Sequence, residues 1–238
     1  LNVAKTNYMI FKPKSLEVDC DTQLSFQNEI IKQVKSTKFL GIIVDENLTW
    51  NYHLKYVCCQ LSKGLFVLRT SKNCLPQWTK KMLYYSYFFS HLTYGLTLWG
   101  PMCTMAYSNR ILSSQKKAVR LVDNAVYNAE TAPIFKKYKM LRFSDVVDLD
   151  LAKLAFSYSK NMLPKPIMGL FSRGSDFHRY NTRGRNNPLV SAHKSTIFNK
   201  SFLCKSPIIL SNLSDDLKNA KHLHSFASKY KKDKFTNY

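Results

Sequence analysis

The sequence of 238 residues lacks the motifs of several common enzyme classes. It has no Gly-rich phosphate loop, no zinc-ligand spacing and no nucleophile pattern of the Ser/His/Asp or Cys/His kind. The six histidines are scattered, and His222 and His224 fall on different faces of a helix because they stand two apart. Asp145, Asp148 and Asp150 lie close together, but they lie at the start of a predicted helix, whose dipole stabilises negative charge. The sequence therefore predicts no metal site.

Signals for secretion and membrane insertion are also missing. No apolar segment of the kind found in a signal peptide follows Lys5. The six cysteines form no CxxC pair, and their spacing does not suggest a set of disulfides, which is typical of reduced thiols in the cytosol or nucleus. The stretch from Met82 to Met102 carries no formal charge. Its hydroxyl groups, glycines and proline argue against a membrane span and favour a buried helix followed by a turn. The sequence predicts a cytoplasmic and nuclear protein that is not secreted.

Acidic residues are scarce. Only 15 Asp and Glu stand against 36 Lys and Arg, which gives a formal net charge of +21. A surface this positive repels itself unless it meets a polyanion, so nucleic acid is the favoured partner and an anionic membrane the second candidate. The hydrophobic fraction of 45% is sufficient for a packed core and argues against global disorder.

The periodicity of apolar residues changes at Asn51. Before it, β-branched and aromatic residues predict strands over 6–12 and 37–44, and a hairpin around Gln27-Asn28-Glu29. After it, a helical period dominates, while residues 165–200 show little period. The predicted helices begin with one of about five turns from Asn51, followed by 78–90, 108–124, a short one after Pro133, 144–161 and 213–235. Gly64, inside the first helix, predicts close packing there. The predicted fold class is α+β, mainly α.

The helix predicted over 108–124 separates apolar and basic residues most clearly. Its apolar face carries Ile111, Ala118, Val119 and Val122. The opposite arc carries the basic residues Arg110, Lys116, Lys117 and Arg120. Cations on a helical face suit the phosphate backbone of a nucleic acid, and a merely solvated charged face is the alternative.

Further basic residues are candidates for the same role. Residues that would extend the surface of the 108–124 helix are Lys63, Arg69, Lys72, Lys80 and Lys81. Arg179, Arg183 and Arg185 flank Tyr180, and arginine interleaved with an aromatic ring suits single-stranded nucleic acid or structured RNA. A flexible basic linker is the alternative for that segment.

Several short stretches, taken in order, resemble the reverse transcriptases of non-LTR (LINE-type) retrotransposons, and most closely the Jockey/CR1-like branch. The stretches are LNVAKT (1–6), KFLGIIVDENLTW (38–50), YVCCQLSKGLFVLRTSKNCLP (56–76), MLYYSYFFSHLTYGLTLWG (82–100), LSSQKKAVRLV (112–122), TAPIFKKYKMLRFSD (131–145), HRYNTRGRNN (178–187) and LSDDLKNAKHLHSFASKYKK (213–232). The sequence departs from the family at His91 and Ser214, where proline is usual.

The resemblance implies an organisation. Residues 1–50 would be the end of the polymerase palm with the palm–thumb hairpin, 51–125 the helical thumb, 126–164 a helical extension and 165–238 a basic C-terminal region. In such a polymerase the metal-binding aspartates lie before Leu1, so Mg²⁺ is expected in the intact enzyme only, and this chain alone is predicted to be inactive. Lys5 would face the incoming triphosphate in the intact polymerase; a solvent-facing lysine at a strand edge is the alternative.

Two functional hypotheses follow. The first is a fragment of an RNA-directed DNA polymerase that grips the RNA template and DNA primer during target-primed reverse transcription. Its partners would be these nucleic acids and the upstream palm and fingers of the polymerase. It would not bind a membrane, and it would act in a ribonucleoprotein of the cytoplasm and nucleus. The alternative is a basic nucleic-acid-binding module without enzymatic activity, or a decayed or domesticated transposon remnant.

Overall fold

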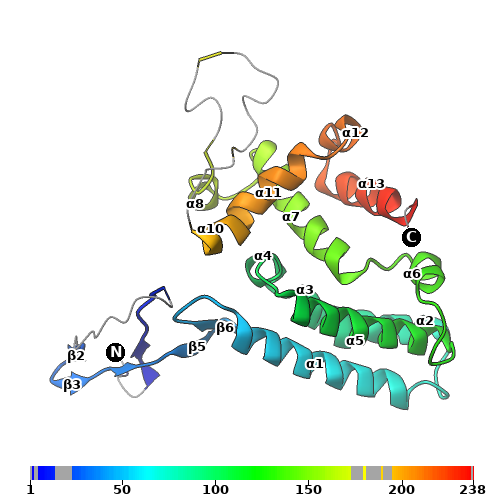
Figure 1. Cartoon of the computed structure of the whole chain (residues 1–238), viewed down its shortest axis with the longest axis horizontal. Helices are drawn as coiled ribbons and strands as arrows, with labels where there is room; N and C mark the ends of the chain where they lie inside the picture. Colours follow the sequence, from blue (N-terminus) through cyan, green and yellow to red (C-terminus); the bar gives the residue numbers. More distant parts are fainter. Residues whose placement is uncertain are drawn as a thin grey trace. The chain divides into compact units, whose positions relative to one another are not determined.

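A computed structural model describes residues 2, 5–13, 23–172, 179–180, 189, 195–236 and 238. The described chain is mainly helical, with a few short strands at its N-terminal end, which confirms the predicted α+β, mainly α class (Figure 1). It divides into two compact units, Leu1–Val57 and Cys58–Tyr238. All described strands belong to the first unit.

The first unit is built from short paired strands. They are β1 (Asn7–Tyr8), β2 (Ser25–Phe26), β3 (Glu29–Ile30), β4 (Lys32–Gln33), β5 (Ser36–Phe39) and β6 (Ile42–Asp45). β1 pairs in parallel with β4, and β2 pairs antiparallel with β3. Gln27 and Asn28 join β2 to β3 with φ of 50° and 63°, which confirms the predicted hairpin. Of the strand predicted over 6–12, only β1 (Asn7–Tyr8) forms.

β5 and β6 form an antiparallel hairpin in which Ser36 faces Asp45 and Phe39 faces Ile42. The single strand predicted over 37–44 is therefore wrong. The chain reverses at Leu40 and Gly41, whose φ values of 46° and 85° belong to a two-residue hairpin turn that glycine adopts readily. A hairpin thus lies where the resemblance implied one. Phe39 and Leu40 at its tip are 66% and 75% exposed.

Asp45 organises the turn that follows this hairpin. Its buried carboxylate accepts hydrogen bonds from the backbone N–H groups of Asn47 (3.2 Å), Thr49 (3.0 Å) and Trp50 (2.9 Å), and from the Thr49 hydroxyl. An ionised carboxylate that accepts several N–H groups makes strong, directional bonds. This network holds the turn between β6 and Asn51 in one conformation.

The helices follow in chain order. They are α1 (Asn51–Thr70), α2 (Gln77–Leu83), the π-helical turn η2 (Tyr84–Phe89), α3 (Ser90–Thr93), α4 (Leu96–Trp99), α5 (Met105–Asp123), α6 (Ala132–Tyr138), α7 (Phe143–Ser159), α8 (Lys165–Met168), α10 (Thr196–Lys200), α11 (Phe202–Ser211), α12 (Asp215–Lys218) and α13 (Leu223–Thr236). α2, η2 and α3 follow one another without a break. In the part of the chain that the structure describes, no helix combines the length and apolar character needed to cross a membrane.

Most helices lie where the period predicted them, with ends shifted by a few residues. Two differences stand out. The helix predicted over 213–235 is interrupted at 219–222, which divides it into α12 and α13. α11 was not predicted, and Pro207 inside it is a residue that usually argues against a helix interior.

The core of the second unit surrounds α5 and α7. α5 packs on α2, η2, α6 and α7, and α7 packs on α4, α11 and α13. The predicted apolar face of α5 is buried throughout: Ile111, Ala118, Val119 and Val122 are fully inaccessible to solvent. Gly64 of α1 also packs closely, because a Cβ there would lie 2.5 Å from the carbonyl oxygen of Tyr87. The close approach predicted from this glycine is confirmed.

Trp99 anchors the segment between α3 and α5. It is fully buried, its indole N–H donates to the Tyr94 carbonyl at 2.9 Å, and its ring stacks on Phe143 with centroids 6.0 Å apart. Gly95 has a φ of 60°, and a Cβ on Gly100 would lie 2.6 Å from the Leu96 carbonyl oxygen. The Tyr-Gly and Trp-Gly pairs of this motif therefore serve the packing of the unit.

Candidate nucleic-acid interface

The basic arc of α5 lies opposite its buried face, as the helical period predicted. Arg110 and Lys117 are exposed, and Lys116 and Arg120 are half-buried. Arg120 is partly engaged in structure, since its Nε donates to the Ala129 carbonyl at 2.8 Å. Among the described residues, no carboxylate forms an ion pair with any of these four side chains. The arc is therefore available to an external anion, with Arg110 and Lys117 the most accessible.

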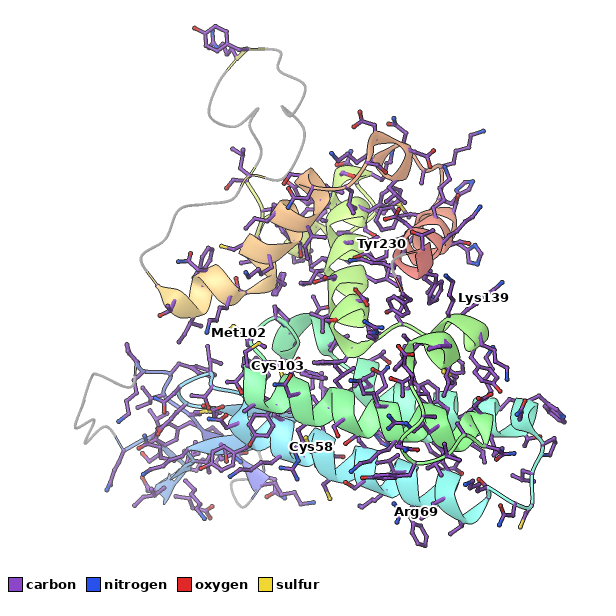
Figure 2. All side chains as sticks on the ribbon, turned by 45° about the vertical axis from the view of Figure 1, so that its right-hand side comes forward. Cys58, Arg69, Met102, Cys103, Lys139 and Tyr230 are labelled. Atoms are coloured by element: carbon purple, nitrogen blue, oxygen red, sulfur yellow. The ribbon has the colours of Figure 1, made fainter. Side chains whose placement is uncertain are left out.

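α1 adds exposed cations of its own. Lys63 and Arg69 are exposed on this helix, and Lys72 follows its end in a half-buried position. Figure 2 shows Arg69 on the side of α1 turned away from α5. The predicted cations therefore lie on more than one helix face.

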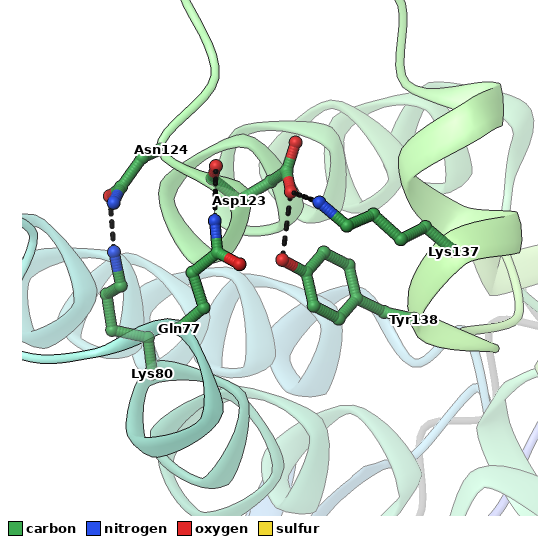
Figure 3. Close-up of polar contacts among 6 residues, drawn as sticks. All are labelled: Gln77, Lys80, Asp123, Asn124, Lys137 and Tyr138. Carbon is green, nitrogen blue, oxygen red and sulfur yellow. Dashed lines mark hydrogen bonds and ion pairs between the residues drawn. The ribbon is translucent and has the colours of Figure 1, made fainter.

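Lys80 does not lie on the predicted nucleic-acid-binding surface. The side chain is fully buried, and its Nζ donates to the Lys72 carbonyl at 3.2 Å and to the Asn124 side-chain oxygen (Figure 3). Burial, followed by the nearby charge of Lys72, lowers the pKa of Lys80, while Asp123 acts in the opposite direction. The prediction that Lys80 contacts nucleic acid is corrected: this lysine joins the end of α1 to the end of α5.

Asp123 connects three elements beside Lys80 (Figure 3). Its carboxylate accepts from Lys137 Nζ at 2.6 Å and from the Tyr138 hydroxyl at 2.8 Å, while its carbonyl accepts from Gln77 Nε2 at 3.2 Å. The hydrogen bond from Lys137 to this carboxylate raises the pKa of Lys137, and burial raises the pKa of Tyr138. Half-buried Lys81 lies 5.9 Å from the centre of the Tyr138 ring. The acid that ends α5 is thus paired with Lys137, a contact the sequence analysis did not predict.

The remaining predicted residues lie elsewhere. Lys5 is exposed in a short turn in which its N–H bonds the Asn2 carbonyl at 3.1 Å. Arg179 and Tyr180 are exposed, and Tyr180 is 79% accessible. Arg183 and Arg185 lie outside the described residues. A nucleic-acid role for these positions stays a prediction.

The three aspartates of α7 do not converge on a metal site. Asp145 pairs with Lys234 at 3.4 Å and accepts from the hydroxyl of Tyr238, and Asp150 accepts from the Thr97 hydroxyl. Burial raises the pKa of Asp148 above its usual range. Across the described ranges, no group of three or more His, Cys, Asp or Glu side chains is arranged to hold a metal ion. The residues present therefore do not fit the two-metal centre of a polymerase.

Comparison with known proteins gives two matches of the same kind. The chain is 28% identical over 130 residues to the probable RNA-directed DNA polymerase from transposon BS of Drosophila melanogaster, which covers 53% of this chain and 14% of that protein. It is 21% identical over 151 residues to the probable RNA-directed DNA polymerase from transposon X-element of the same organism, or 62% and 16% of the two chains. No family model and no solved structure matches. The matched segments span only 14% and 16% of the two curated relatives, so the chain is similar to a part of these RNA-directed DNA polymerases.

Proposed function

We propose that this chain is the thumb and adjoining C-terminal part of the reverse transcriptase of a LINE-type retrotransposon. It holds the RNA template and DNA primer during target-primed reverse transcription, in a ribonucleoprotein of the cytoplasm and nucleus. The observation that carries the proposal is the basic arc of α5, in which Arg110 and Lys117 are exposed and free of ion pairs with described residues.

The physical task of a thumb explains why such a surface is suitable. A polymerase must hold duplexes of any sequence, and contacts to phosphates position a duplex without reading its bases. Cations hold their spacing best on a rigid element, and α5 is rigid because its opposite face is fully buried. The similarity to two transposon polymerases supports the same proposal, that the chain is part of a polymerase.

The β5–β6 hairpin supports a second contact near the primer end. Phe39 and Leu40 expose apolar surface at its tip, and the Asp45 network holds its base. Lys5 would face the incoming triphosphate in the intact polymerase. The Mg²⁺-binding carboxylates would come from the upstream palm, since Asp145 and Asp150 of α7 are engaged in structural contacts.

The proposal is tested by the salt dependence of binding to an RNA–DNA hybrid. Fluorescence anisotropy would compare the wild type with Arg110→Glu/Lys117→Glu. Loss of two phosphate contacts should make the slope of log K against log salt shallower by about two, at about 0.9 for each phosphate. Arg110→Lys/Lys117→Arg retains the charge and should keep the slope.

A matched control separates this surface from overall charge. Lys221→Glu/Lys232→Glu changes the net charge equally at exposed positions outside α5 and should leave most of the affinity. Equal weakening by both charge reversals would contradict the assignment to α5 and leave only a non-specific effect of charge.

The alternative is a basic nucleic-acid-binding module without enzymatic activity, with which the separate engagement of Asp145 and Asp150 is equally compatible. Both hypotheses predict binding and no primer extension by this chain with Mg²⁺ and nucleotides; extension would contradict both. Sequencing the transcript upstream of Leu1 distinguishes them. An open frame that encodes paired aspartates supports the polymerase, and a stop codon or a start codon without those aspartates supports the module.

A further inference from the structure

A cavity of about 240 Å³ lies in the second unit, away from the basic arc of α5. Its lining comes from four parts of the chain that are distant in sequence: the continuous η2 and α3, residues 139–141, α7 and α13. Its volume is below the range of about 300–1,000 Å³ that is typical of pockets for drug-sized ligands. A single planar group is therefore a better fit than a larger molecule.

One wall of the cavity is aromatic. Tyr85 and Phe89 of η2 line it, with ring centroids 5.3 Å apart and planes at 74°. Tyr85 is 38% exposed, so its ring is accessible from the solvent. Buried Tyr84 contacts both rings, with centroids 5.3 Å from Tyr85 and 6.0 Å from Phe89, so the exposed part of the Tyr85 ring is the aromatic surface that remains for a further ring. Such π-helical turns occur often at functional sites.

The lining of the cavity is also basic. Lys139, Lys153 and Lys231 line it and come from three different segments, against one acid, Asp150, which accepts from the Thr97 hydroxyl. Within the described part of the chain, none of these lysines forms an ion pair. Burial and the charge of Lys153 lower the pKa of Lys231, so the site holds cations whose mutual repulsion an anion would relieve.

Lys139, which lines the cavity, has a strained backbone conformation. It ends α6 with a φ of 54°, in the left-handed region that helix ends usually fill with glycine. Figure 2 shows it between α6 and α13. A lysine at this position contributes a cation to the cavity lining, where a glycine would contribute none.

We propose that this cavity binds one unstacked nucleotide of a single-stranded nucleic acid, with its base against Tyr85 and Phe89 and its phosphate among Lys139, Lys153 and Lys231. Base stacking on aromatic rings with nearby cations is how proteins hold single strands without reading sequence. A base inside a duplex is already stacked and cannot enter. The inference rests on the proposed function, to which it adds a single-strand site distinct from the duplex surface.

The test compares a short single-stranded RNA with an RNA–DNA hybrid of the same sequence, both measured by fluorescence anisotropy. Tyr85→Ala should weaken binding of the single strand about five- to 150-fold, the range expected for one lost stacking contact. Binding of the hybrid should not change. Tyr85→Phe keeps the ring and should bind like the wild type, which controls for damage to the fold.

Two further measurements address the base and the phosphate separately. A 2-aminopurine in the single strand should change its fluorescence on binding to the wild type and not to Tyr85→Ala, because stacking alters its emission. Lys139→Gln/Lys153→Gln/Lys231→Gln should make the salt slope of single-strand binding shallower by about 0.7, the value for one phosphate of a single strand.

The outcomes separate this inference from the proposed function. Loss of hybrid binding in Arg110→Glu/Lys117→Glu, combined with unchanged single-strand binding in Tyr85→Ala, overturns the inference and leaves the proposed function standing. Single-strand binding that depends on Tyr85 in a protein that does not bind the hybrid supports the cavity and contradicts the duplex surface. Equal weakening of both ligands by Tyr85→Ala also overturns the inference.

Discussion

Gln115 of α5 donates a hydrogen bond from Nε2 to the hydroxyl of Tyr84 in η2, at 3.0 Å, and both side chains are buried. The same nitrogen donates to the Leu141 carbonyl at 2.8 Å. One amide therefore joins α5, η2 and the segment that leads into α7. Burial raises the pKa of the Tyr84 phenol, in keeping with a hydroxyl that stays neutral inside the core.

Replacement of Gln115 by methionine should destabilise the second unit. Methionine has a similar shape but donates no hydrogen bond, so the Leu141 carbonyl and the Tyr84 hydroxyl lose their partner at a cost of about 1–3 kcal/mol. Guanidinium unfolding measures this cost. Tyr84→Phe removes one bond only and should cost less, and a larger effect in Tyr84→Phe than in Gln115→Met would contradict this account.

Lys80→Met should lower stability without lowering the affinity for an RNA–DNA hybrid. The variant keeps the apolar stem but leaves the Lys72 carbonyl and the Asn124 side chain without their donor, at a cost of about 1–3 kcal/mol. Unfolding and hybrid binding would be measured on the same protein. Lys81→Met is a control for stability only, since Lys81 is itself a candidate nucleic-acid contact, and its lost cation–π contact should cost about 0.5–1 kcal/mol. Weaker hybrid binding by Lys80→Met at unchanged stability would show that Lys80 contacts nucleic acid after all.

Gly64→Ala should be destabilising, although alanine is favoured over glycine by about 1 kcal/mol inside an exposed helix. The added Cβ would lie 2.5 Å from the Tyr87 carbonyl oxygen, so α1 and η2 must separate. The sign of the change in unfolding free energy is the measurement. A gain in stability would show that the helices do not approach as closely as described.

Mild acid should destabilise the first unit through His53. This side chain is buried, its Nδ1 accepts from the Ile43 N–H at 3.3 Å, and burial lowers its pKa from 6.5 to about 4. Between these values the unfolded chain binds more protons than the folded chain. The free energy of unfolding therefore falls as the pH drops, by up to about 1.4 kcal/mol per pH unit and about 3 kcal/mol in all.

His53→Gln isolates this contribution. Glutamine does not titrate, so the variant should show a flatter dependence of unfolding free energy on pH between pH 6.5 and 4, whatever its stability at neutral pH. Guanidinium unfolding at a series of pH values compares the two proteins. Parallel curves for the wild type and His53→Gln would rule out His53 as the group that titrates.

The periodic parts of the fold were predictable because helix period is a local property. The buried face of α5 and the close approach at Gly64 both follow from residues a few positions apart. The strand pattern missed the β5–β6 hairpin, which only the resemblance implied, although Gly41 between two apolar runs is a signal that could have revealed it. α11 gave no such signal, since Pro207 stands inside it.

The helical period did not predict which side of the continuous helix formed by α2, η2 and α3 faces the core. Trp78 and Met82 share an apolar side with Tyr85, yet they are 67% and 58% exposed. The buried side carries Tyr84, Phe88 and Leu92 instead. A π-helical turn has a longer period than an α-helix, so it shifts the phase of the faces along this continuous helix.

The sequence by itself determined the fold class, the run of helices, the positive charge and the resemblance to a reverse transcriptase, since each depends on composition or on short stretches. Only the tertiary structure decided which lysines face outward. From the sequence, Lys80 resembles a surface lysine. Its ammonium group is buried because oxygen atoms of Lys72 after α1 and Asn124 after α5 accept its hydrogen bonds. Lys139, Lys153 and Lys231 meet at one cavity because α7 and α13 pack together, a contact between distant segments that no local pattern encodes.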